Sequence, residues 1–426
     1  MMRPNGRAFK DERVTIMAFG LTKKELSWVL YDVGNSAFVM LSTALIPVYF
    51  ASIADPGSSV VVAWGYAETV ASLVLALLMP VLGSLADLAG NKKKFLVGFA
   101  GTGAVACAAL GIPEHALAFL VVYVIAAIML NGSMVFYDAF LVDATTEERY
   151  DKVSSHGYAW GYIGSCIPFI ACLAVVLGGS SFGIDAKLGM KIAFIITAAW
   201  WVVFTVPVAK NVKQLHGKKR SDHVLRATIS GLKGTVKSIV KDKRLLFFML
   251  AFFFYIDGVH TVIKMSTSYG TDLGIDSTQL VLALLVTQFV AFPSAIAYGN
   301  LAKRFGTKRM LKVGVLAYFF IVLFAAFFLK SAVEFWILAI CVGLFQGGIQ
   351  ALSRSEYGKL IPKERANEYY GFFDIFGKYA AVMGTFLVSA FTQLTGSSSL
   401  GVLSIALLFI VGFLFLRAMP PMLGDS

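Results

Sequence analysis

Charged side chains are scarce in this sequence: Asp, Glu, Lys and Arg make up 15% of its 426 residues, whereas 58% are hydrophobic. Together with a mean hydropathy of +0.75, this balance excludes a water-soluble globular domain, in which about a quarter of the residues are charged. Apolar stretches of about 20 residues, long enough to cross a ~30 Å hydrocarbon core as a helix, recur along the chain. We therefore expect an all-α membrane protein with twelve transmembrane helices. The stretches are residues 27–52, 60–86, 95–112, 115–142, 153–178, 188–209, 245–271, 278–301, 310–329, 333–352, 368–393 and 398–418.

Cysteine and histidine are also rare, with 4 and 5 residues. All the cysteines lie within the apolar stretches, where they behave as small apolar residues rather than as disulfide or metal pairs. The sequence has no Gly-x-x-x-x-Gly-Lys-Ser/Thr loop for ATP phosphates, no His-Glu-x-x-His and no Cys-x-x-Cys. We therefore expect no metal, no cofactor and no primary active transport. Because no nucleophile can be paired with a base, we expect no enzyme.

The net charge of +12 would suit a nucleic-acid partner, but the positions of the basic residues indicate another cause. Lys187, Lys191 and Lys330 lie near loops on one side, and Lys264 and Lys378 lie within apolar stretches, which leaves 32 of the 37 Lys and Arg in the tails and the loops of the other side. This asymmetry follows the positive-inside rule and predicts that both termini are cytoplasmic. We expect no nucleic-acid partner.

The N-terminal tail, residues 1–26, contains no convincing cleavable signal, so we expect the first helix to direct membrane insertion. The loops are compact, which favours a bacterial cytoplasmic membrane over a vacuole. A monomer suffices for the expected fold.

Two loops repeat each other at an offset of 216 residues: "GSLADLAGNKKKFL" begins at Gly83 and "GNLAKRFGTKRMLK" begins at Gly299. The same offset carries Glu148-Arg149 onto Glu364-Arg365 and Gly161 onto Gly377. We therefore expect two six-helix halves of parallel origin. The predicted domains are a tail at 1–26, bundles at 27–209 and 245–418, a cytoplasmic linker at 210–244 and a tail at 419–426.

The linker is strongly basic and contains a periodic apolar pattern. Its apolar residues are spaced by 4, 3, 4 and 3 positions, which predicts one apolar stripe along a helix that rests on the cytoplasmic leaflet. A helix that binds a partner protein is the alternative. The stripe consists of Leu225, Ile229, Leu232, Val236 and Ile239, with Lys233, Lys237 and Lys241 elsewhere on the helix.

The stretch "GSLADLAGNKKK" resembles the loop signature of the major facilitator superfamily, and twelve spans in a 6+6 repeat fit that fold. The resemblance implies that Asp87 bonds across an inner gate, while the lysines contact neighbouring helix ends and lipid phosphates. The alternative is that these residues only fix topology and surface charge. Lys303 stands where Asp87 would fall in the second half, so the two gates are not chemically equivalent. The motif residues are Gly83, Asp87, Gly90, Lys92, Lys93 and Lys94.

Three further stretches narrow the resemblance. "YDVGNSAF", "FFYIDGVHTVIK" and "SRSEYGKLIPKERANEYYGFFDIFGKYAAVMG" resemble the branch related to the autophagy-associated vacuolar amino-acid effluxers and their bacterial relatives. The resemblance implies an amino acid or a similar solute as substrate.

Charges within the predicted helix at 245–271 are expensive. A central Asp or Lys costs roughly 2.5 to 3.5 kcal/mol on insertion scales, whereas each large apolar residue returns only about 0.3 to 0.6 kcal/mol. Asp257, His260 and Lys264 lie at i, i+3 and i+7, on one helix face. Such residues are candidates for a substrate, ion or proton pathway; a structural pair bonded to another helix is the alternative.

Other buried polar residues occur in three more predicted helices. Asp374 and Lys378 lie at i and i+4, close enough for a salt bridge. Asp138 and Asp32 fall in helices that the superfamily resemblance places around a central cavity. Asp32, with Asn35 on nearly the same face, either belongs to an inner gate or contacts substrate or protons.

These observations favour a secondary transporter that moves a small polar solute by alternating access, with protons as a candidate coupling ion. Asp257 is the leading protonation site, because a neighbouring His260 can titrate near physiological pH. Lys264 or Lys378 would hold a carboxylate or phosphate of the substrate. The stretch "GYAWGYIGSCIP" lacks the Gly-Pro pair of superfamily antiporters, which argues against proton antiport. Alternatives are a lipid or lysolipid flippase of the same fold and a non-transporting membrane sensor.

Overall fold

The computed structural model describes residues 18–54, 60–218 and 224–420, without the side chains at 60–62, 224–231, 267–268, 272, 277–278 and 378–382. The first part of the chain forms α1 (Lys23–Ala44), α2 (Ile46–Ile53), α3 (Val60–Ala86), α4 (Lys92–Ala109), α5 (Ala116–Ala139), α6 (Leu141–Ala144), α7 (Tyr150–Gly178), α8 (Ala186–Asn211) and α9 (Val224–Lys241). The second part forms α10 (Lys243–Asp272), α11 (Ser277–Phe305), α12 (Thr307–Phe328), α13 (Ala332–Leu360), α14 (Ala366–Thr395), α15 (Ser398–Ser404) and α16 (Ala406–Ala418). Four short 3-10 turns lie at Ala18–Gly20, Glu147–Arg149, Gly179–Phe182 and Lys363–Arg365.

The prediction of an all-α membrane fold is confirmed, and each of the twelve predicted stretches contains helix. Among the described residues, nine helices are long and apolar enough to cross a membrane, and the bent pair α1 and α2 would be a tenth. The helix breaks at Leu45 with a bend of 44°. Pro47 causes this break, because proline donates no backbone hydrogen bond and its ring crowds the preceding turn.

Several helices extend beyond the predicted boundaries. The clearest case is α13, which was expected to end at residue 352 and runs to Leu360. Its last turns carry Arg354, Glu356 and Lys359, so hydropathy falls although the helix continues. Arg354 and Glu356 are buried among other helices, and Lys359 is half-buried, so ion pairs replace most of the water around these charges.

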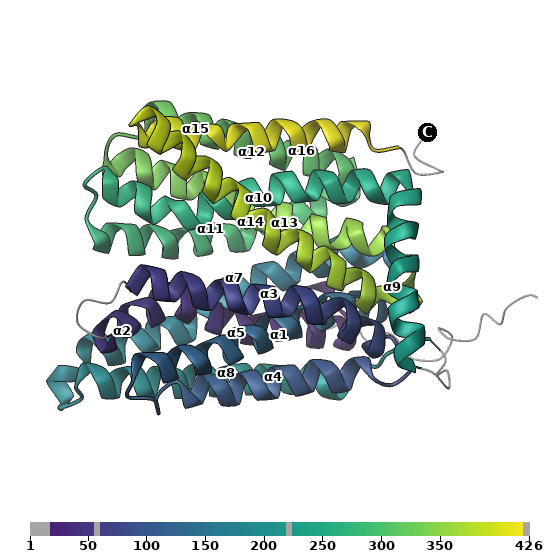
Figure 1. Cartoon of the computed structure of the whole chain (residues 1–426), viewed down its shortest axis with the longest axis horizontal. Coiled ribbons are helices and arrows are strands. Elements are labelled where there is room, and N and C mark those ends of the chain that lie inside the picture. Colours follow the sequence, from purple (N-terminus) through teal and green to yellow (C-terminus); the bar gives the residue numbers. More distant parts are fainter. Residues whose placement is uncertain (1–17, 55–59, 219–223, 421–426) are drawn as a thin grey trace, which may run out of the picture.

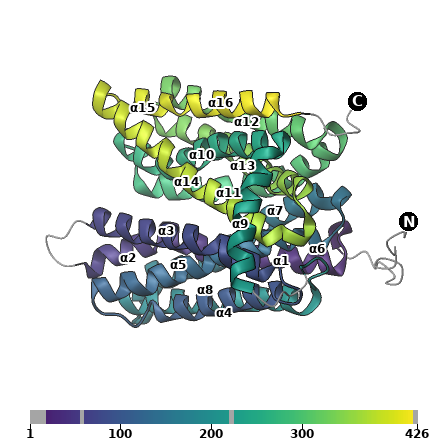
Figure 2. The same ribbon diagram turned by 45° about the vertical axis from the view of Figure 1, so that its right-hand side comes forward.

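The helices form two bundles, joined at one end by α9 (Figure 1). α1 to α8 make one bundle and α10 to α16 make the other; Figure 2 shows α9 crossing from one to the other. Two seams hold the bundles together, because α7 packs against α11 and α3 packs against α14. α14 begins 216 residues after α7, so the two seams are related by the sequence repeat.

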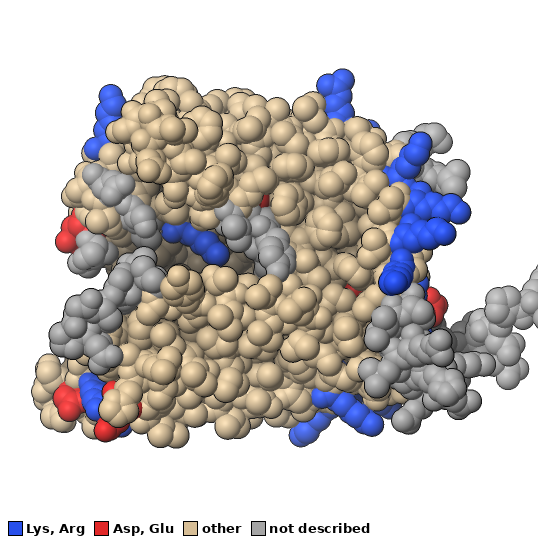
Figure 3. Space-filling model, in the orientation of Figure 1, with Lys and Arg blue, Asp and Glu red and all other residues tan. Residues whose placement is uncertain are grey.

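The seams depend on small residues where backbones cross. A Cβ atom on Gly83 of α3 would lie 2.6 Å from the Asn367 carbonyl oxygen of α14. On the other seam, a Cβ on Gly299 of α11 would lie 2.6 Å from the Ser155 hydroxyl oxygen of α7. At the end away from α9, the face between the bundles is hollowed (Figure 3). The bundles therefore make their closest polar contacts at the α9 end, where the candidate site begins.

Candidate functional site

A buried arginine on α13 joins the two bundles. The Arg354 side chain is 1% exposed; its Nη1 lies 2.9 Å from Asp138 Oδ1 on α5 and 3.5 Å from Asp32 Oδ2 on α1. Asp138 and Arg354 are 216 residues apart, so they occupy equivalent positions in the two repeats. Equivalent residues of two repeats meet only on the axis that relates the repeats, which places this ion pair on the axis between the two bundles.

The other two nitrogens of the guanidinium also have hydrogen-bond partners. Nε donates to the Ser154 hydroxyl at 2.9 Å, and Nη2 donates to the Ser154 carbonyl oxygen at 3.0 Å, both on α7. The aromatic rings of Trp28, Tyr137 and Tyr158 lie with their centroids 4.7, 5.3 and 4.3 Å from the guanidinium carbon. Such cation–π contacts strengthen when water is excluded. Arg354 therefore binds α1, α5 and α7 of the first bundle at once.

Asp32 lies inside this cluster. Its carboxylate accepts hydrogen bonds from Tyr137 Oη at 3.0 Å and from Asn35 Nδ2 at 3.4 Å. A Cβ on Gly157 would lie 3.0 Å from Asp32 Oδ2 and 2.9 Å from Arg354 Nη2. The glycine therefore leaves the space in which the carboxylate and the guanidinium approach. In this conformation Asp32 belongs to the closure between the bundles, and Asn35 contacts it from the same helix.

The sequence analysis missed Arg354, which it counted among the charges of a cytoplasmic loop beyond residue 352. The structure places it within α13 and buries it. One signal could have found it: the 216-residue offset that aligns the two loops also aligns Arg354 with Asp138, a residue already identified as a buried acid.

Asp87 forms a second layer of contacts between the bundles. Its Oδ1 accepts from the backbone N–H and side-chain amide of Asn367 at 2.9 and 2.8 Å, and its Oδ2 accepts from the Glu368 N–H at 3.0 Å. These donors are the first turn of α14, where the helix dipole favours a carboxylate. Burial raises the pKa of Asp87 to about 6, although Lys92, Lys218 and the Asn367 bonds act in the opposite direction.

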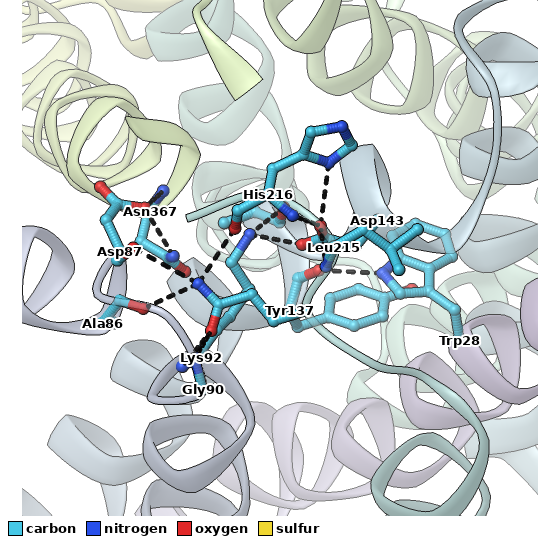
Figure 4. A network of polar contacts seen from close by, with 12 residues as sticks. Trp28, Ala86, Asp87, Gly90, Lys92, Tyr137, Asp143, Leu215, His216 and Asn367 are labelled. Atoms are coloured by element: carbon cyan, nitrogen blue, oxygen red, sulfur yellow. Dashed lines mark hydrogen bonds and ion pairs between the residues drawn. The ribbon is translucent and has the colours of Figure 1, made fainter. Parts of the chain in front are cut away.

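The motif lysines divide into buried and accessible residues. Lys92 is fully buried, and its Nζ lies 2.6 Å from Asp143 Oδ2 (Figure 4). Lys94 is exposed and Lys93 is half-buried. Burial alone would raise the pKa of Asp143, but Lys92 and the His216 bonds outweigh it and lower the pKa. Lys92 therefore serves an internal ion pair rather than a lipid contact.

The segment that precedes α9 is part of the same layer. Asp143 Oδ1 accepts from the N–H groups of Leu215 and His216 at 2.8 and 2.9 Å. The Gln214 side-chain oxygen accepts from Gly90 N at 2.9 Å, where the backbone φ is +83° and favours glycine. Lys218 pairs its backbone with Asp87 and Ala89. The start of the predicted linker is thus fixed to the gate motif rather than free.

The seam between α7 and α11 is also closed at the α9 end, but by a different set of charged residues. Lys359, equivalent to Asp143, lies 2.7 Å from Asp151 Oδ2, and Asp151 is equivalent to Asn367. Asp151 also accepts from Ser355 and from Thr307 at the start of α12, at 2.5 and 2.7 Å. Both seams are therefore closed at the α9 end, each by its own set of polar groups.

A separate polar cluster lies on α10 within the membrane-spanning region. Asp257 is fully buried; its Oδ1 accepts from Gly384 N of α14 at 2.9 Å and from the Thr261 hydroxyl at 3.2 Å. Its Oδ2 has no hydrogen-bond partner among the described residues. His260 is half-buried and Lys264 is exposed. Along this face of α10, exposure therefore increases from the buried Asp257 carboxylate to the exposed Lys264 ammonium.

Of the predicted pair Asp374 and Lys378, the structure describes only the Asp374 side chain. Asp374 is half-buried on α14 and contributes to the electrostatic environment of Asp138. The Lys378 side chain lies outside the described residues. Among the described residues, no group of three or more His, Cys, Asp or Glu side chains could hold a metal ion.

Comparison with known families is decisive for the classification. The model of the family described as "Vacuole effluxer Atg22 like" matches residues 57–422. The chain belongs to the Atg22-like family. It is 46% identical over 408 residues to an uncharacterised transporter of the major facilitator type, YxiO of Bacillus subtilis, covering 94% of this chain and 95% of that protein. It is 26% identical over 283 residues to autophagy-related protein 22 of Cryptococcus neoformans, covering 61% of this chain and 48% of the fungal protein.

Solved structures show the same fold. The major facilitator transporter FucP in its outward conformation superposes with a TM-score of 0.72 at 14% identity, covering 94% of this chain and 99% of FucP. The proton:xylose symporter XylE superposes with a TM-score of 0.70 at 10% identity, covering 93% and 94% of the chains. The Atg22-like chain is therefore a multi-pass membrane transporter of the major facilitator superfamily, as the loop motif indicated.

We predict that Arg354→Gln destabilises the protein strongly. The variant leaves Asp32 and Asp138 buried without a cation, a situation that typically costs about 3–5 kcal/mol. The thermal unfolding midpoint of the full chain in detergent measures the effect. Arg309→Gln, which removes an exposed arginine from the same end of the molecule, is the matched control. Adding Asp138→Asn to Arg354→Gln should recover part of the loss, because one unpaired charge disappears. Equal midpoints for Arg354→Gln and Arg309→Gln would contradict the closure.

We predict that Asp87 contributes a pH dependence of known sign. Its pKa is raised from 3.8 to about 6, so the folded state binds the proton more tightly than the unfolded state. The contribution of the carboxylate to stability is therefore largest at low pH and is lost as pH rises through about 6. The unfolding midpoint of wild type minus that of Asp87→Asn should therefore become less positive, or more negative, between pH 5 and pH 7.5. A signed difference that stays constant or rises over this range would contradict the raised pKa.

Proposed function

We propose that this Atg22-like protein is a secondary active transporter that moves a small polar solute, such as an amino acid or a related zwitterion or anion, by alternating access. The observation that carries the proposal is the Arg354 closure. It holds two repeat-related bundles together at one end by a buried ion pair, on the axis about which the bundles would rock. The accessible Lys264 beside His260 supplies polar groups for a solute in the interior.

The orientation follows from the distribution of charge. If the α9 end is cytoplasmic, as the positive-inside rule predicts, the structure represents an outward-facing state with its cytoplasmic side closed. The similarity to FucP in the outward conformation supports this assignment. The similarity to a Bacillus protein along nearly the whole chain supports the cytoplasmic membrane of a bacterium as the location, with both termini inside.

Opening of the closed end requires that Arg354 separates from Asp32 and Asp138. In the open state water reaches these groups, so the cost is smaller than that of an unpaired buried charge. A ligand can shift such an equilibrium only by its differential affinity for the two states. A ligand that binds only one of the two states, at 100 times its dissociation constant, favours that state by about 2.7 kcal/mol, which can reverse an energy difference of up to about that size.

We assign separate roles to the α10 residues. Asp257 takes up a proton at the oxygen that has no partner among the described residues, and His260 relays it. Lys264, the accessible end of this face, holds the carboxylate or phosphate of the solute. Asp374 and Lys378 on α14 complete the polar lining. Asp32, Asn35 and Asp138 act in the gate with Arg354 rather than on the solute.

Transport assays on Asp257→Asn test this assignment. The variant keeps the acceptor for Gly384 N and Thr261 but cannot exchange a proton. Candidate amino acids and organic anions are first selected by thermal shift of the purified wild type. In proteoliposomes with a pH gradient, wild type should accumulate the selected solute, whereas Asp257→Asn should exchange it without accumulation. Equal accumulation by both proteins would remove Asp257 from the coupling mechanism.

Lys264→Gln tests the solute contact. We expect at least a tenfold rise in the solute concentration for half-maximal thermal shift, since a charge-assisted bond to the solute is lost. Lys330→Gln, which removes an exposed lysine from the loop between α12 and α13, should leave the value unchanged. Lysolipids are included in the same screen. If lysolipids alone stabilise the wild type, the polar-solute proposal fails and the flippase alternative replaces it.

A further inference from the structure

The helix α9 presents two chemically different faces. It packs against α3 of one bundle and α10 of the other. Thr235 and Ile239 face inward and are 0% and 7% exposed. Of the predicted apolar stripe, Ile239 is buried against the bundles and Val236 is 47% exposed, and the side chains of Leu225 and Ile229 lie outside the described residues. Thr235, a polar residue, occupies one of the buried positions on the inward face of α9.

Thr235 links α9 to the gate. Its hydroxyl donates to Glu368 and accepts from the Arg365 guanidinium. Glu368 also accepts from Arg365 Nη2 at 2.8 Å and from Lys218 Nζ at 2.7 Å. The backbone N–H of the same Glu368 donates to Asp87. A displacement of α9 therefore acts on the residue that Asp87 uses to hold the two bundles together.

The outer face of α9 is basic and partly apolar. Its exposed side chains at i, i+3, i+4, i+7 and i+8 share one side of the helix, and no acidic residue occurs between residues 224 and 241. Figure 3 shows basic side chains gathered at this end of the molecule. Val240 is 58% exposed. The face consists of Lys233, Val236, Lys237, Val240 and Lys241, and we refer to it as the outer α9 face.

We propose that the outer α9 face binds the headgroups of anionic phospholipids and that bound lipid holds α9 against the closed gate. Lysines with exposed valines between them match an interface in which phosphates lie above acyl chains. Each lysine near an anionic leaflet strengthens binding by about fivefold. The inference rests on the proposed membrane orientation, but it does not depend on the transported solute.

The interaction of purified full-length protein with phosphatidylglycerol tests the site. The thermal unfolding midpoint is titrated with short-chain phosphatidylglycerol or phosphatidylcholine in detergent. Wild type should be stabilised by the anionic lipid at lower concentration than by the zwitterionic lipid. K233Q/K237Q should raise the half-maximal phosphatidylglycerol concentration by about tenfold or more. The matched control R304Q/R309Q removes two exposed positive charges from the α11–α12 region at the same end and should behave as wild type.

Two results would overturn the proposal: equal stabilisation by the two lipids in wild type, or the same half-maximal concentration in K233Q/K237Q as in wild type. A loss of equal size in R304Q/R309Q would show general charge attraction instead of a site, and would overturn it as well.

A separate variant tests whether α9 is coupled to the gate through Thr235. Thr235→Val removes the hydroxyl between α9 and Glu368 and leaves the lysines in place. The half-maximal phosphatidylglycerol concentration should stay within about twofold of wild type, while the maximal shift in midpoint should fall. An unchanged maximal shift would refute the coupling. Because no readout uses a substrate, failure of this proposal and failure of the transport proposal can be told apart.

Discussion

The buried guanidinium of Arg354 is the interaction on which the closed arrangement depends. A cation in a site without water needs partners for all its donors, and here those partners come from three helices of the opposite bundle: Asp32 on α1, Asp138 on α5 and Ser154 on α7. Separating the bundles removes every partner at once. The same residue therefore makes the closed state specific and makes its opening an event that water or ligands must compensate.

The sequence repeat explains how such a pair arises. Two halves of common origin bring equivalent positions together at their axis, so identical residues there would give two like charges or two neutral groups. In this chain the axial position carries Asp138 in one half and Arg354 in the other. The outer positions diverge too, since Asp143 pairs with Lys92 whereas its equivalent, Lys359, pairs with Asp151. Divergence of charge after duplication converts a symmetric fold into one with a defined closure at one end.

The contacts at the closed end form successive layers that differ in exposure. The Arg354 cluster lies on the axis between the bundles, Asp87 makes a separate contact with the start of α14, and the segment from Gln214 to Lys218 contacts the loop that carries Asp87. Through Thr235 and Glu368 the outermost layer includes α9. In the two proposals made above, the solute and protons would act on this closed end from the interior, and anionic lipid would act on it through α9.

The sequence by itself determined the fold class, the repeat and the gate motif, because hydropathy and residue spacing are local properties of a helix in a lipid solvent. It also marked Asp32, Asp138 and Asp257 as costly inside a membrane. Only the tertiary structure decided which of them meet: Asp32 and Asp138 join Arg354, whereas Asp257 lies against Gly384 of α14. Hydropathy did not identify Arg354 as buried. A charged residue just after an apolar stretch looks the same in the sequence whether it lies in a loop or in a buried ion pair. The burial of a charge depends on partners from distant helices, and no local pattern records them.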